Sequence, residues 1–112
     1  MELKTNEVYI LGTKYTIEED SQAKNPKLIN SNAYVELWSK KIVFENNVAT
    51  IETLENLDEL TKKSLRHEAI HAMFHESGLK SYCQDEVLID WIALQFGKLS
   101  KIFNELGIEE TK

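Results

Sequence analysis

Short runs of β-branched and aromatic residues alternate with turn-forming polar residues in the first half of the chain. Two such runs make up residues 8–19 and meet around Gly12, which is a hairpin signal. Residues 33–46 contain two further runs on either side of Ser39. We therefore expect a small antiparallel sheet of three to four strands, and we interpret it as a structural platform.

The pattern changes at Asn56, where apolar residues begin to recur at helical spacing. Asn56 is expected to cap this helix with Glu59 as its capping-box partner, and Gly78 is expected to end it. The positions expected to make apolar contacts are Leu57, Leu60, Leu65, Ala69, Ala72 and Met73. Those expected to face water are Lys62, Lys63 and Arg66. The segment is therefore predicted to form one helix of about six turns.

A second helix is predicted from about Asp85 to Gly97, followed by a short third helix within residues 98–107. The second helix is apolar on nearly every side, so we expect it to be buried. With 112 residues, of which 42% are hydrophobic, the chain suits one packed domain covering residues 1–112. The predicted fold class is α+β, with a small sheet followed by helices.

Composition narrows the range of partners and the compartment. The net charge is -6 and no basic cluster with interleaved aromatics is present, which argues against a nucleic-acid partner. No apolar run reaches the roughly 18 residues of a membrane helix, which argues against a membrane partner. The single cysteine, Cys83, cannot form an internal disulfide, and residues 1–12 lack the pattern of a signal peptide. These features favour a cytoplasmic location.

All three histidines lie in the predicted first helix, and two of them form a His-Glu-x-x-His segment. His67 and His71 are four residues apart, so both imidazoles lie on one helix face about 6 Å apart and can bind one ion. Glu68 follows the first histidine and is placed to deprotonate a metal-bound water. The alternative is two surface histidines beside a solvated glutamate, without any metal.

A catalytic zinc needs a third protein ligand. His75 lies about 12 Å beyond His67 along the helix axis. His67, His71 and His75 therefore cannot all bind the same ion. We expect His75 to interact with the exposed carbonyls at the helix C-terminus instead.

The third ligand is expected on the next helix. Because about eight residues can return the chain over the distance from Gly78, a helical hairpin would place Glu86 opposite the histidines. Asp90, one turn later, should then face His67 and accept its other ring N–H. The alternatives are Cys83 as a thiolate ligand and a salt bridge from Asp90 to a surface lysine.

Residues 66–79, RHEAIHAMFHESGL, and residues 85–96, DEVLIDWIALQF, resemble zinc peptidases in which His-Glu-x-x-His is completed by a glutamate, the gluzincin arrangement. They are also similar to the ImmA/IrrE-like metallopeptidases of phages and mobile elements. The resemblance covers residues 60–96, and the first 55 residues match only in general architecture. The larger relatives have an additional domain, and we do not expect one within these 112 residues.

The resemblance implies a minimal zincin-like domain with one Zn²⁺ per chain, held by His67, His71 and Glu86. It also implies a catalytic role for Glu68 and a supporting role for Asp90. The substrate would be a protein or peptide, such as a repressor, and a phage-encoded enzyme would act in the host cytoplasm.

Three functions are compatible with the sequence. The first is a zinc-dependent endopeptidase, in which Glu68 would activate water. An edge strand near residues 42–44 would pair with extended substrate. Tyr34 and Tyr82 are the candidates for stabilising the oxyanion. The second function is a non-catalytic, zinc-stabilised regulatory or phage-associated binding protein, in which Glu68 would have no role. The third uses the histidines as a pH switch. The sequence leaves the oligomeric state open.

Overall fold

The structure, a computed structural model, describes residues 3–29, 31–45 and 57–110. A four-stranded sheet precedes two helices, so the fold is α+β as predicted. The elements are β1 (Glu7–Ile10), β2 (Thr13–Asp20), the short 3-10 helix η1 (Pro26–Leu28), β3 (Ala33–Glu36), β4 (Lys41–Glu45), α1 (Leu57–Glu76) and α2 (Glu86–Leu106). The predicted N-cap at Asn56 lies outside the described residues.

The sheet is mixed, so the prediction of an antiparallel sheet was wrong for one of its three strand pairs. The strand order is β1-β2-β4-β3. The neighbours β1 and β2, and likewise β3 and β4, pair antiparallel as hairpins, whereas β2 and β4 pair parallel. The connection between β2 and β3 is too long for a tight hairpin, so β3 does not lie beside β2. The next strand, β4, fills the gap and therefore runs parallel to β2.

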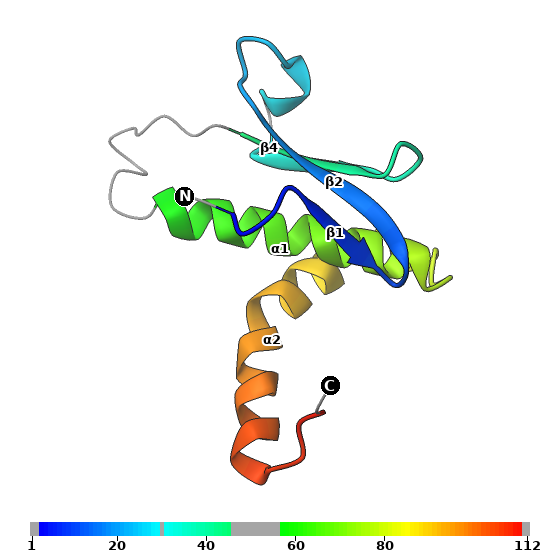
Figure 1. Ribbon diagram of the computed structural model, residues 1–112, viewed down its shortest axis with the longest axis vertical. Helices are drawn as coiled ribbons and strands as arrows, with labels where there is room; N and C mark the ends of the chain where they lie inside the picture. Colours follow the sequence, from blue (N-terminus) through cyan, green and yellow to red (C-terminus); the bar gives the residue numbers. More distant parts are fainter. Residues whose placement is uncertain (1–2, 30, 46–56, 111–112) are drawn as a thin grey trace.

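The core lies between the sheet and α1, which crosses one face of the sheet (Figure 1). Tyr15, Ile42 and Ala72 are buried together there, with Leu65 packed against them. Lys62, Lys63 and Arg66 are exposed, as predicted. The predicted apolar contact at Met73 was wrong, since this side chain is 49% exposed.

Glu76, in the last turn of α1, ties that end of the helix to the sheet. Its carboxylate accepts hydrogen bonds from Tyr15 Oη at 2.6 Å, Lys40 Nζ at 2.7 Å and Thr13 Oγ1 at 3.0 Å. The bond from Lys40, followed by that from Tyr15, lowers the pKa of Glu76 to about 2. Burial and the bond to Glu76 raise the pKa of Tyr15. These bonds fix how α1, and therefore its histidines, lies on the sheet.

The second helix begins where the sequence predicts and continues further. The side chain of Asp85 accepts a hydrogen bond from the backbone N–H of Leu88 at 3.0 Å, which caps the N-terminus of α2. The helix passes through Gly97 and ends at Leu106, and Gly107, with φ of 69°, is its C-cap. The predicted break at Gly97 and the separate third helix were therefore wrong. A glycine in a helix interior costs only about 1 kcal/mol, and the helical spacing of apolar residues continues beyond it.

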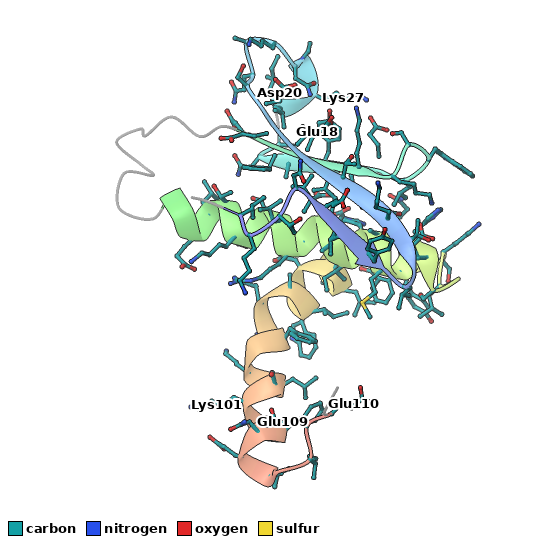
Figure 2. All side chains as sticks on the ribbon, in the orientation of Figure 1. Glu18, Asp20, Lys27, Lys101, Glu109 and Glu110 are labelled. Carbon is teal, nitrogen blue, oxygen red and sulfur yellow. The ribbon has the colours of Figure 1, made fainter. Side chains whose placement is uncertain are left out.

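The predicted burial of α2 was also wrong. Only Ile89 and Ala93 of this helix are buried. Instead of returning alongside α1, α2 leaves it at a steep angle, and its C-terminal half projects from the rest of the molecule (Figure 1). Figure 2 shows the side chains of this projecting part, including the labelled Lys101, far from the sheet.

Candidate metal centre

His67 and His71 lie one turn apart on α1, with their rings turned toward the same point. Their Nε2 atoms are 3.2 Å apart, and the ring centroids are 4.9 Å apart. His71 is buried, and the side chain of His67 is 19% exposed. The four-residue spacing therefore produces the shared face that helix geometry predicts.

Glu86, the first residue of α2, brings its carboxylate to both rings. Its Oε2 atom lies 2.8 Å from His67 Nε2, and its Oε1 atom lies 3.0 Å from His71 Nε2. The turn between the helices and the cap at Asp85 set this position. Residues 77–85 thus return the chain far enough for Glu86 to face both histidines.

The three side chains form a group that could hold a metal ion, with one donor atom from each lying within 4.8 Å of the others. Two zinc ligands with bonds of about 2.0–2.1 Å and a tetrahedral angle are separated by about 3.3 Å. The observed separations of 2.8, 3.0 and 3.2 Å are close to that value. Two imidazoles and one carboxylate suit zinc, and the donor set also accepts other divalent transition metals.

Cys83 supports this group through its backbone. Its carbonyl oxygen accepts a hydrogen bond from His71 Nδ1 at 2.5 Å, and because a carbonyl can only accept, Nδ1 carries the proton. His71 Nε2 is then free to donate its lone pair to a metal. Sequence reasoning missed this contact because every residue has a carbonyl, so no residue type marks it.

The thiol of Cys83, which the sequence left as an alternative ligand, is directed elsewhere. Its Sγ atom donates to the backbone oxygen of His71 at 3.3 Å. Burial, followed by the charge of Glu86, raises the pKa of this thiol. Among the described residues, the group of donor atoms contains Glu86 and not Cys83.

Asp90 faces the outer ring nitrogen of His67. Its Oδ1 atom lies 3.6 Å from His67 Nδ1, which is ion-pair distance and slightly longer than a direct hydrogen bond. Within the described part of the chain, Asp90 forms no ion pair with a lysine. Its position one turn after Glu86 therefore lets a carboxylate influence the orientation of His67.

Glu68 lies beside the histidines in a cleft of about 560 Å³ between α1, β3 and the start of α2. Burial raises the pKa of Glu68 to about 7, while nearby His67 and a backbone hydrogen bond from Val35 act in the opposite direction. Its carboxylate is thus held between the candidate ligands and the sheet. This is the position from which a side chain can take a proton from a water in the cleft.

The edge strand next to this cleft is β3. The prediction that residues 42–44 form the edge was wrong, because β4 is paired on one side with β2 and on the other with β3. Residues 33–35 of β3 line the cleft. The backbone N–H of Glu45 donates to Asn32 O, and since backbone groups alternate along an antiparallel pair, those of Val35 point away from β4, toward the cleft.

The remaining sequence candidates do not belong to the group of donor atoms found among the described residues. His75 lies in the last turn of α1 and meets Trp38 edge-on, with ring centroids 6.0 Å apart. Tyr34 lines the cleft, where its hydroxyl accepts a hydrogen bond from Asn25 Nδ2 at 2.8 Å. Tyr82 is half-exposed and does not line the cleft.

Comparison of the chain with protein-family models, with curated proteins and with solved structures gave no match. Within the described residues, neither helix combines the length and the hydropathy that crossing a membrane requires.

Proposed function

We propose that this protein is a zinc-dependent metallopeptidase. The observation that carries the proposal is the convergence of His67, His71 and Glu86 beside Glu68 in an open cleft. A structural zinc is enclosed by four protein ligands, whereas a catalytic zinc keeps one position open. The described residues supply three donors to this group, and the carboxylate of Glu68 beside them is one that a purely structural site does not need. Both features match the catalytic pattern.

Different residues of the protein have different roles in the proposed hydrolysis. Zinc, when bound, supplies a Lewis acid for the scissile carbonyl. Glu68 takes a proton from the attacking water and then passes it to the leaving amine. The carbonyl of Cys83 holds the ring of His71 through a hydrogen bond, and Asp90, at ion-pair distance, favours one orientation of the His67 ring.

The substrate is an extended segment of a protein. Such a segment adds to the open side of β3 through backbone hydrogen bonds, next to Glu68. A second hollow, of about 530 Å³, begins at His67 and Glu86 and is lined by the exposed apolar side chains of Val87, Trp91 and Leu94. It suits a large apolar side chain of the substrate. The resemblance to phage and mobile-element peptidases makes a repressor a reasonable first substrate to test.

The test uses protein purified without a histidine tag, and compares the wild type with Glu68→Gln. The substitution keeps the size of the side chain and removes its basicity, so zinc should remain at one ion per chain by elemental analysis. Cleavage of an unfolded protein should fall by about 10² to 10⁴-fold. Equal cleavage by both zinc-loaded proteins would contradict the mechanism and would identify a contaminating protease.

The exposed apolar surface of α2 favours one alternative, a metal-stabilised binding protein. In that case the zinc-loaded wild type would cleave no substrate, and zinc removal would lower its melting temperature. Under that alternative, Glu68→Gln would change neither the absence of cleavage nor the melting temperature of the zinc-loaded protein.

A further inference from the structure

The C-terminal half of α2 and the residues after it, up to Glu110, carry an apolar surface that the other described residues leave exposed. Every residue from Phe96 to Glu110 is exposed. The large apolar side chains in this segment are between 40% and 65% exposed: Phe96, Leu99, Ile102, Phe103, Leu106 and Ile108. In an isolated chain all of this apolar surface would be exposed to water. Monomeric proteins rarely expose contiguous apolar patches of this size.

The spacing of these residues indicates the shape of the partner. Phe96, Leu99, Phe103 and Leu106 follow one another at intervals of three, four and three residues. This is the spacing of the a and d positions in a heptad, and a stripe of this kind packs against another helix. Lys101, halfway along this segment, lies on the opposite side of the helix from the stripe. The surface therefore fits a helix better than a flat sheet or a lipid surface.

The positions beside the stripe are uncharged and therefore permit a second copy of the same chain as the partner. In a coiled coil, charged residues flanking the stripe select the partner and repel wrong ones. The flanking positions here are Gln95, Ser100 and Ile102, which carry no charge. Two copies can therefore approach through this stripe without like charges meeting, although each chain has a net charge of -6.

The area is sufficient for a dimer. If a fully exposed large apolar residue offers roughly 150–200 Å² of surface, the four stripe residues and the flanking Ile102 at their observed exposures offer about 400–530 Å² per chain. Apolar atoms make up about 65% of a homodimer interface, so the corresponding total is about 600–800 Å² per chain. Interfaces of standard size bury about 600–1,000 Å² per partner.

We propose that the protein is a homodimer in which the projecting halves of two α2 helices pack against each other through Phe96, Leu99, Phe103 and Leu106. Glu86 lies at the other end of α2, about 15 Å along the axis from Phe96, so the metal centre stays accessible in the dimer. Dimerisation is independent of the bound metal and of peptidase activity.

The test is the mass of the untagged protein in solution, by light scattering after size exclusion and by sedimentation over a range of concentrations. The wild type should have about 26 kDa, twice the 13.0 kDa of one chain, and should keep this mass after zinc is removed. Leu99→Glu and Phe103→Glu should each weaken the dimer by at least about 30-fold, the effect of losing a central contact. Both side chains are exposed in the monomer, so circular dichroism should show unchanged helix content.

Lys101→Gln is the matched control, because it makes the same change of one charge unit on the opposite face of the same helix. It should leave the mass at that of the dimer. A wild type that stays at 13.0 kDa up to high micromolar concentration would overturn the proposal. A dimer that both glutamate variants leave intact would also overturn it, because the stripe would then not be the interface.

Discussion

His71 Nδ1 donates to the backbone oxygen of Cys83 at 2.5 Å, and the thiol of Cys83 donates to the backbone oxygen of His71 at 3.3 Å. The two residues are therefore joined in both directions across the turn between α1 and α2. The contact that orients the histidine comes from the backbone, and the side chain of Cys83 contributes only the weaker contact and its packing.

The first prediction separates these two contributions. Cys83→Ala keeps the carbonyl and should keep one zinc ion per chain, while the free energy of unfolding falls by about 1 kcal/mol because a small buried side chain is lost. Glu86→Ala should lower zinc content strongly, because it removes the only anionic donor of the group. Elemental analysis and urea unfolding measure the two effects. A larger loss of zinc in Cys83→Ala than in Glu86→Ala would make the thiol the ligand.

The second prediction compares two histidines of the same helix. His71→Ala should abolish stoichiometric zinc binding, because its Nε2 is one of three donors. His75→Ala, one turn further along α1, should leave zinc at one ion per chain and should alter the fluorescence of Trp38, which its ring meets. Loss of zinc in His75→Ala would show that the ligand set is incorrect.

The motif and the approximate start of α2 are predictable from sequence because both depend on local geometry. A spacing of four residues determines which side chains share a helix face, and chain length determines how far Glu86 can return. The parallel pairing of β2 with β4 is not predictable in this way. It depends on which strand lies beside β2 after the long connection between β2 and β3, and local spacing does not determine this. The edge position of β3 follows from the same pairing, so the strand beside the cleft was also misassigned.

The exposure of α2 was mispredicted for a different reason. A helix that is apolar on nearly every side is expected to pack against other protein surfaces. The sequence does not indicate whether these surfaces belong to the same chain or to another one. In the part of the chain that the structure describes, Ile89 and Ala93 are buried, whereas Phe96 and the apolar residues beyond it are exposed. The direction in which α2 leaves α1 determines which of its apolar residues are buried and which are exposed (Figure 1).

The third prediction concerns acid stability. A carboxyl group whose pKa is lower in the folded protein stabilises the fold above its ordinary pKa, and this stabilisation is lost as the pH falls toward the lowered value. For Glu76 the window runs from about 4.5 down to about 2. Urea unfolding midpoints of the wild type should therefore fall more steeply across this range than those of Glu76→Gln. Glu59→Gln, at an exposed position of the same helix, should behave as the wild type.

The absence of a difference between wild type and Glu76→Gln below pH 4.5 would contradict the role of the carboxylate that joins α1 to β2. Lys40→Gln provides an independent check, since the bond from Lys40 is the largest cause of the lowered pKa. It should reduce the steepness without removing it, because the bonds from Tyr15 and Thr13 remain.

The last prediction uses the two tryptophans of the chain, both of them largely exposed. Trp91 lines the hollow beside His67 and Glu86, whereas Trp38 lies in the turn between β3 and β4. If the hollow holds an apolar substrate side chain, Trp91→Ala should lower kcat/KM about 10- to 100-fold for peptides with a large apolar residue there. Peptides with alanine at that position should be affected much less. Zinc content and melting temperature should not change, because Trp91 is neither a metal ligand nor buried. Trp38→Ala, the matched control, should leave kcat/KM unchanged for both peptides, and an equal loss in the two variants would exclude the hollow as the selective site.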